Sequence, residues 1–188
     1  GPDPDLVDGC LDRLGVESID AVVLTHFHLD HAGGLEGATR GRTVGVLLTT
    51  WVTEPEDIVR GVRRWASDHH VPTQQLHADD SLSYGTLRAE VWWPERRISA
   101  GSIPNNASVV LAVETGGVRA LLLGDIEREA GAAIASRIRR DAARMTTSTT
   151  FDVVKTPHHG SANLDPKLMA AVRSPLAVIS VGADNDYG

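Results

Sequence analysis

The chain has 188 residues, with 41% hydrophobic and 23% charged side chains, a balance typical of one globular domain with a sizeable core. Its formal charge of −7 argues against a basic surface that binds nucleic acid, but not against a phosphate-containing substrate at a metal centre. The single cysteine, Cys10, excludes an internal disulfide and a thiolate-rich zinc finger, and no apolar run approaches the roughly 18 residues that span a bilayer.

The first predicted element is a helix that starts at Pro4 and ends before Gly15. Asp3 is a candidate N-cap, and proline suits the first helical position. Apolar residues then recur at helical spacing, and Cys10 is one of them. We therefore expect Cys10 to lie in the core rather than to act as a nucleophile.

A predicted buried strand over residues 21–24 is followed by four potential metal ligands: His26, His28, Asp30 and His31. In an extended segment alternate side chains share a face, so the first two histidines can bind one ion. The last two follow where the chain bends and can reach a second ion. We expect the next two residues, both glycine, to let the backbone turn closely past the metals. The alternative, a group of solvated loop histidines, is far less favoured for this spacing.

Further apolar runs predict strands at 44–48, 87–93, 108–113, 118–123, 151–155 and 176–181. Helices are predicted at 53–68, 126–140 and 165–172, and loops at 95–104 and 144–150. The Glu-Thr-Gly-Gly sequence at 114–117 indicates a hairpin. Strand pairs mixed with strand–helix units indicate a single α/β-type domain over residues 1–188, with two sheets flanked by helices.

Two later strand ends also carry candidate ligands. Asp125 follows a wholly apolar strand, where a carboxylate is costly unless it is paired or bound to metal; the alternative is an N-cap for the next helix. His158 and His159 follow the strand that ends at Lys155. Because adjacent side chains of an extended backbone point in opposite directions, we expect one histidine to bind metal and the other to line the pocket. Convergence of three strand ends would form a dinuclear hydrolase site.

These motifs, together with Gly124 before Asp125, resemble the metallo-β-lactamase superfamily, which implies a four-layered αββα sandwich. Within it, the sequence looks most like the metallo-β-lactamase-like domain of ComEC-type DNA-internalisation competence proteins. The stretches that carry this likeness are 1–4, 20–34, 105–108, 122–126, 154–161 and 182–188.

The resemblance implies a metal-dependent nuclease or phosphodiesterase with two divalent ions, Zn or Mn, that acts on DNA during competence DNA uptake. A water activated between the two ions would attack phosphorus. Asp125 would bridge the ions, and Asp30, His159 and Lys155 are the candidate catalytic residues. The expected metal ligands are His26, His28, Asp30, His31, Asp125 and His158.

The chain departs from the superfamily pattern in two ways. Many members have a further metal-binding histidine where this chain reads Pro-Asn-Asn-Ala-Ser at 104–108. We therefore expect Asn105, Asn106 and Ser108, with Ser161, to contact substrate or groups around the metals. Related domains also begin with a further strand pair and continue past residue 188 with a histidine, so the chain resembles a fragment truncated at both ends.

The resemblance further implies a parent protein embedded in a bacterial membrane, with this domain on the extracytoplasmic side and single-stranded DNA as partner. Two alternatives stay open. The same fold can hydrolyse a different bond, such as a thioester, a lactone or a small phosphodiester, because function depends on the pocket around the metals. The chain could also be a non-catalytic module that binds the transported strand.

Overall fold

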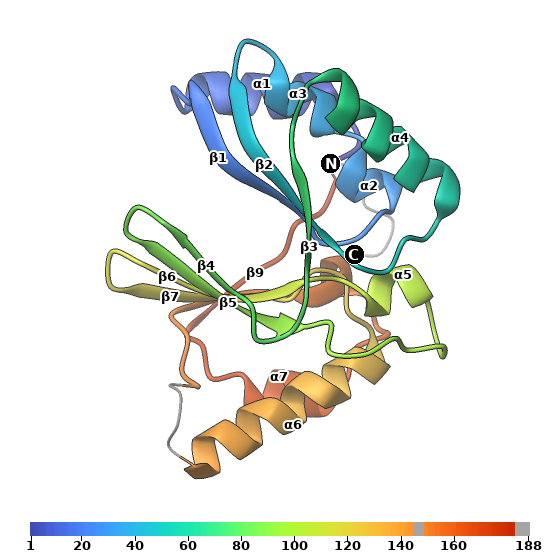
Figure 1. Cartoon of the computed structure of the whole chain (residues 1–188). Helices are drawn as coiled ribbons and strands as arrows, with labels where there is room; N and C mark the ends of the chain where they lie inside the picture. The colour runs from blue at the N-terminus through green and yellow to red at the C-terminus, as the bar shows by residue number, and fades with distance from the viewer. Residues whose placement is uncertain (145–148, 183–188) are drawn as a thin grey trace. The chain divides into compact units, whose positions relative to one another are not determined.

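The computed structural model describes residues 1–144 and 149–182 (Figure 1). Most of the predicted 144–150 loop and of the 182–188 stretch lies outside the described residues. The chain divides into two compact units, Gly1–Leu76 and His77–Gly188. Over the described residues, no helix combines the length and apolarity that crossing a bilayer requires. The single-domain organisation stays a prediction.

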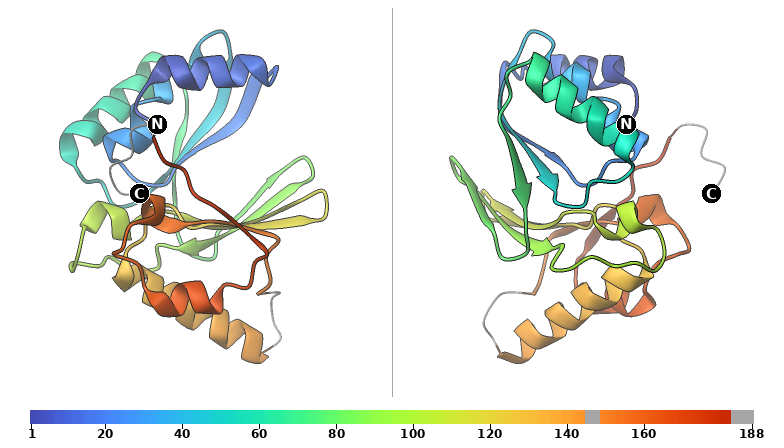
Figure 2. Two further views of the ribbon diagram at one scale, coloured as in Figure 1. Left: turned by 180° about the vertical axis from the view of Figure 1, so that it is seen from behind. Right: turned by 45° about the vertical axis from the view of Figure 1, so that its right-hand side comes forward.

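The first unit contains a parallel sheet of strand order β1-β2-β3 with helices between its strands. Helix α4 covers one face of this sheet (Figures 1 and 2), and its residues Val59, Val62 and Trp65 pack with Leu47 of β2. The elements are α1 (Pro4–Arg13), β1 (Ser18–Leu24), α2 (Leu29–Ala32), α3 (Leu35–Thr39), β2 (Thr43–Thr50), α4 (Glu56–Asp68) and β3 (Thr73–Leu76).

Helix α1 begins as predicted, with the Asp3 side chain accepting a hydrogen bond from the Asp5 amide at 2.8 Å. The prediction that Cys10 lies in the core is wrong, because the cysteine is exposed and no residue of α1 is buried. Polar contacts hold the helix instead. The guanidinium of Arg42, whose side chain is only 2% exposed, donates to Asp8 Oδ1 at 2.7 Å and to the Val16 carbonyl at 2.8 Å.

The glycines after the first ligand motif permit close packing rather than a special turn. Gly33 and Gly34 both have helical, negative φ angles. A Cβ on Gly33 would lie 2.8 Å from the Pro2 carbonyl oxygen, and one on Gly34 would lie 2.7 Å from that of Gly1. The loop that carries the ligands therefore packs closely on residues 1–2. The sequence pattern predicts a turn past the metals and does not predict this contact.

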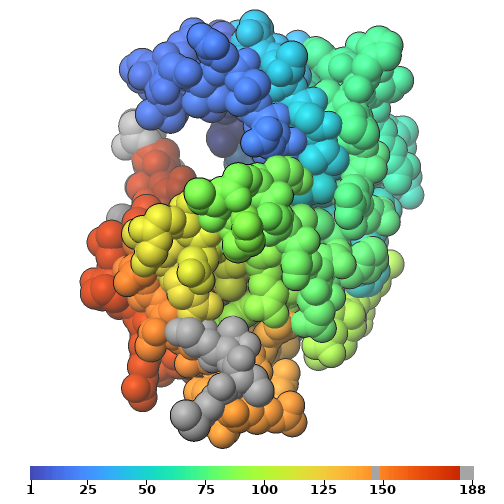
Figure 3. Space-filling model, turned by 60° about the vertical axis from the view of Figure 1, so that its left-hand side comes forward, coloured from blue at the N-terminus to red at the C-terminus, as the bar shows by residue number. Residues whose placement is uncertain are grey.

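The second unit contains a mixed sheet of order β4-β5-β6-β7-β8-β9, antiparallel from β4 to β7 and parallel from β7 to β9. The predicted hairpin joins β6 and β7 through Gly116 and Gly117, both with positive φ. It reaches the surface (Figure 3, yellow), where Val118 is 47% exposed. The elements are β4 (Ser81–Tyr84), β5 (Leu87–Trp93), α5 (Ile103–Asn106), β6 (Val110–Thr115), β7 (Val118–Leu122), α6 (Arg128–Arg144), β8 (Val153–Lys155), η1 (Pro157–Gly160), α7 (Pro166–Ala171) and β9 (Leu176–Val178).

The core of the second unit lies between the sheet and helices α6 and α7 (Figures 1 and 2). Leu121 of β7 and Val154 of β8 pack there with Ile134 and Leu168. The carboxyl ends of the parallel strands are the part of the sheet that carries the candidate ligands. Because β7, β8 and β9 are parallel, the segments that follow them emerge at the same edge of the sheet.

Candidate metal-ligand clusters

The first cluster follows β1 in the first unit and contains the four predicted ligands. His28 is the N-cap of α2, so Asp30 and His31 lie on the first turn of that helix. The ring of His26 contacts the other two imidazoles, with centroid distances of 4.8 Å to His28 and 4.1 Å to His31. The structure therefore brings these predicted ligands together within one unit.

Thr25 orients two of these histidines, a role that the sequence patterns did not predict. Its hydroxyl lies 3.1 Å from His26 Nδ1 and 3.4 Å from His31 Nδ1. Metal-binding histidines are commonly held in this way, with one ring nitrogen in a hydrogen bond and the other directed at the ion. The contact favours Nε2 as the metal-binding atom of His26, whereas Nε2 of His31 faces Asp30.

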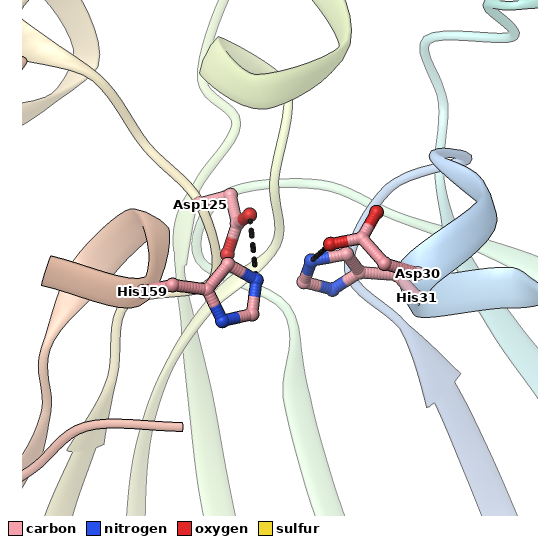
Figure 4. A group of neighbouring side chains, drawn as sticks. All are labelled: Asp30, His31, Asp125 and His159. Carbon is pink, nitrogen blue, oxygen red and sulfur yellow. Dashed lines mark ion pairs between the residues drawn. The ribbon is translucent and has the colours of Figure 1, made fainter. Parts of the chain in front are cut away.

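Asp30 is paired with its neighbour in the helix turn (Figure 4). Its Oδ2 lies 3.4 Å from His31 Nε2, and its side chain is 50% exposed. The hydrogen bond from His31 holds the pKa of Asp30 well below its ordinary value, against the opposing effect of partial burial. The carboxylate is therefore ionised throughout the neutral range, as a metal ligand must be.

Asp125 begins the second cluster, on the loop that follows β7. The residue is 2% exposed, and its backbone amide donates to Ser108 Oγ at 3.0 Å. Its Oδ2 lies 3.3 Å from His159 Nε2 (Figure 4), and its Oδ1 lies 3.6 Å from Lys155 Nζ. Ser108 thus holds the loop that carries Asp125.

The backbone at the histidine pair differs from the extended segment that we predicted. His158 and His159 have φ angles of 47° and 51°, in the left-handed region that is uncommon for residues other than glycine. Such conformations persist where surrounding contacts enforce them, and they are frequent at functional sites. The amide of His158 donates to the Gly124 carbonyl at 3.1 Å, which ties this turn to the residue before Asp125.

The turn places His159, rather than His158, beside Asp125. His159 Nδ1 lies 2.6 Å from the Ser180 carbonyl, which can only accept, so Nδ1 carries a proton. In the neutral ring, Nε2 is then an acceptor, and it faces a carboxylate oxygen of Asp125. Two acceptors in this arrangement require a proton or a cation between them. The donor atoms of this cluster therefore fit a divalent metal ion.

His158 turns toward a different carboxylate. Its Nδ1 lies 3.7 Å from Glu127 Oε1, and its Nε2 lies 3.5 Å from Asn105 Nδ2. The predicted metal-ligand role of His158 and the predicted catalytic role of His159 stay predictions. Because His159, and not His158, is paired with Asp125 here, the geometry favours His159 as the metal ligand and His158 as the residue that lines the pocket.

The predicted substrate-binding residues occupy unlike environments. Asn106 is 1% exposed and uses its whole amide: Oδ1 accepts from the Glu127 and Ala130 amides, while Nδ2 donates to the Ala100 carbonyl and to Glu129. These contacts cap the start of α6. They favour a structural role over substrate contact, which stays a prediction.

The two predicted serines are also engaged locally. Ser108 is fully buried against the Asp125 amide. Ser161 follows the histidine turn, and its hydroxyl accepts from the Asn163 amide at 3.2 Å. Their roles as substrate contacts stay predictions.

Lys155 contacts protein groups rather than lying fully exposed. Its Nζ donates to the carbonyls of Gly124 and Thr156, each at 3.1 Å, in addition to its ion pair with Asp125. The ammonium therefore offsets the charge of a buried carboxylate. A further role toward substrate stays a prediction.

Three residues near the ligands were missed: Thr25, Glu127 and Ser180. For Thr25 and Glu127 a signal existed in their positions, next to His26 and two residues after Asp125. Ser180 acts through its carbonyl, to which no side-chain pattern points.

Histidine and carboxylate ligands at the strand ends of a mixed α/β fold define a class of metal-dependent proteins to which many hydrolases belong. The family model described as the metallo-beta-lactamase superfamily matches residues 4–175. The chain therefore belongs to the metallo-beta-lactamase superfamily, and its two sheets with flanking helices confirm the predicted fold class.

Relatives agree with the predicted subgroup. The chain is 30% identical to ComE operon protein 3 of Bacillus subtilis (strain 168) over 176 residues, which are 92% of this chain and 21% of that protein. It is also 30% identical to the uncharacterized protein YcaI of Escherichia coli (strain K12) over 169 residues, or 89% of this chain and 19% of that protein. The chain thus spans about a fifth of the length of these relatives.

A solved structure shows the same fold. A mutant of the CmlA beta-hydroxylase matches with a TM-score of 0.52 at 16% identity, over 83% of this chain and 29% of that one. At this level of identity the likeness concerns the fold alone.

Proposed function

We propose that this chain is a metal-dependent phosphodiesterase domain that cleaves DNA during competence DNA uptake. The observation that carries the proposal is the cluster of His26, His28, Asp30 and His31 after β1 in a chain 30% identical to ComE operon protein 3. The proposal extends to single-stranded DNA as substrate and to a membrane-embedded bacterial parent protein with this domain on its extracytoplasmic side.

The ligand sets suit two divalent ions. In this proposal, the four residues after β1 hold one ion, and the pair Asp125 and His159 holds the other. Support comes from the superfamily membership and from the donor atoms within each unit. A mixture of imidazole and carboxylate donors suits Zn or Mn.

Bound ions would supply Lewis acidity, lower the pKa of a coordinated water and offset charge on the phosphate oxygens. The protein's own contribution is orientation. Thr25 holds His26 and His31, and the Ser180 carbonyl holds His159 with Nε2 toward Asp125. Lys155 reduces the negative charge around Asp125, so the carboxylate is held without full burial of an unpaired charge.

A substrate panel tests the proposal. The domain, loaded with Zn or Mn, is assayed on single-stranded DNA, a simple phosphodiester, a lactone and a thioester. We expect cleavage of DNA, reduced more than about 100-fold in Asp125→Ala and in Asp30→Ala because each removes a ligand. Asp79→Ala is the matched control, since Asp79 is an exposed carboxylate that pairs with Arg137.

The other outcomes contradict the proposal in different ways. Hydrolysis of only the lactone or the thioester would assign the same fold to a different bond. Binding of DNA without cleavage under either metal would indicate a non-catalytic module. Full activity in both aspartate variants would exclude the ligand assignment itself.

A further inference from the structure

Glu127 is a buried carboxylate that none of the predicted roles includes. It is 6% exposed and lies two residues after Asp125. Its Oε2 accepts from the Ser102 amide at 2.9 Å, and its Oε1 accepts from Asn105 Nδ2 at 3.0 Å. A buried charge of this kind is costly unless it is well hydrogen-bonded, and these two donors provide that pairing.

The carboxylate determines which way the Asn105 amide points. An ionised carboxylate can only accept, so the amide nitrogen of Asn105 must face Glu127 and the amide oxygen must face away. Asn105 is 4% exposed, and within the described residues its Oδ1 has no hydrogen-bond partner. Glu127 therefore makes Asn105 present a buried acceptor that a ligand can use.

The Oε1 atom of Glu127 also faces the ring of His158. His158 Nδ1 lies 3.7 Å from Glu127 Oε1, and His158 Nε2 lies 3.5 Å from Asn105 Nδ2. The tautomer with hydrogen on Nδ1 suits both neighbours, because it directs the N–H toward the carboxylate, beyond hydrogen-bond distance, and leaves Nε2 to accept from the second amide hydrogen of Asn105. Glu127 thus favours one of the two neutral forms of this imidazole.

The loop before α5 packs directly on the carboxylate. A Cβ on Gly101 would lie 2.8 Å from Glu127 Oε2, and the φ angle of Gly101 is +68°. Gly101 and the Ser102 amide therefore fix one side of Glu127, while Asn105 and His158 lie on the other.

We propose that Glu127 is a positioning residue of this site, which fixes the amide orientation of Asn105 and the tautomer of His158 for substrate. The proposal rests on the proposed hydrolase function. In this proposal, Glu127 supports both Asn105 and His158. Asn105 stands where many superfamily members have a histidine, and its Oδ1 would serve as a hydrogen-bond acceptor directed at substrate.

The activity test uses Glu127→Gln. Glutamine keeps the shape but puts a donor nitrogen opposite either the Ser102 amide or Asn105 Nδ2, so the arrangement must loosen. We expect kcat on single-stranded DNA to fall about tenfold or more while KM changes little. Glu129→Gln is the matched control, because Glu129 accepts from Asn106 at the start of the same helix, and it should leave kcat unchanged.

A mutant cycle distinguishes an effect of Glu127 on Asn105 and His158 from a general loss of folding. In an Asn105→Ala, His158→Ala background, Glu127→Gln should have almost no further effect on kcat, because the residues through which it acts are gone. An undiminished effect in that background, or an equal loss in Glu129→Gln, would overturn the proposal.

Nitrogen-15 NMR of the histidine rings gives a readout that does not need activity. His158 is assigned by the signal lost in His158→Ala. We expect the Nδ1–H form in the wild type and a shift toward a tautomer mixture in Glu127→Gln; an unchanged tautomer would refute the assignment. If the wild type cleaves none of the substrates, the proposed function fails, whereas the NMR comparison still decides the role of Glu127.

Discussion

Neighbouring asparagines illustrate how little residue type alone decides at this site. Asn106 forms four side-chain hydrogen bonds and caps α6, whereas Asn105 keeps an acceptor without a hydrogen-bond partner among the described residues. Both were predicted to contact substrate. Their hydrogen bonds distinguish the two residues, and these contacts cannot be read from the sequence.

Replacement of Asn106 should therefore affect stability. Asn106→Ala leaves the Glu127 and Ala130 amides and the Glu129 carboxylate without their partner. We expect the free energy of unfolding to fall by about 2 kcal/mol or more, measured by urea denaturation. Asn105→Ala should cost less stability. An Asn106→Ala variant as stable as the wild type would contradict the capping role.

Asp30 gives the site a defined pH dependence. Because His31 lowers its pKa, the folded state binds the Asp30 proton more weakly than the unfolded state does. The resulting stabilisation is present above the ordinary aspartate pKa of about 4 and is lost as the pH falls further. We expect Asp30→Asn to lose less unfolding free energy than the wild type between about pH 5 and pH 2. Parallel pH profiles in urea titrations would exclude this interaction.

The histidine turn marks the limit of prediction at the residue scale. The pattern predicted ligands after β1 and a carboxylate after β7, and the structure places these side chains at those strand ends, while their role as ligands stays a prediction. The pattern could not show that His158 and His159 adopt left-handed φ angles, since that conformation is imposed by contacts such as the one with the Gly124 carbonyl. An extended backbone therefore gave the wrong geometry for the pair.

At the scale of elements, apolar runs were a reliable guide and polar strands were not. β5 has the bounds that its pattern predicts, while β3, with the sequence Thr-Gln-Gln-Leu, was missed because only Leu76 is buried. Helix α1 shows the opposite error. Its apolar spacing predicted a buried face, yet Leu6 is 72% exposed and the C-cap residue Leu14 is 70% exposed; Arg42 contacts the helix through polar groups.

Two helical glycines test the packing of the first unit. A Cβ on Gly37 of α3 would lie 2.0 Å from the Pro4 carbonyl oxygen, whereas one on Gly61 of α4 would meet open space. We expect Gly37→Ala to lower the free energy of unfolding by more than about 1 kcal/mol, because backbone must move. Gly61→Ala should raise it by about 0.5–1 kcal/mol through helix propensity. Equal stabilities in thermal melts would refute the contact between α1 and α3.

At the scale of the whole molecule, the chain is acidic, with a formal charge of −7, and each of its units carries its own set of metal donors. Superfamily membership was predictable because ligand spacing survives in sequence. The contacts of Glu127 were less accessible, since its hydrogen bonds with Ser102 and Asn105 form only on folding.

Measurement of bound metal tests whether these histidine and carboxylate side chains hold metal ions. The purified domain is equilibrated with Zn or Mn, dialysed and analysed for bound metal per chain. We expect about two ions per chain in the wild type, about one in a His26→Ala, His28→Ala variant, and a loss in Asp125→Ala, as removal of ligands requires. A wild type that retains no metal, or variants that retain as much as the wild type, would contradict this expectation.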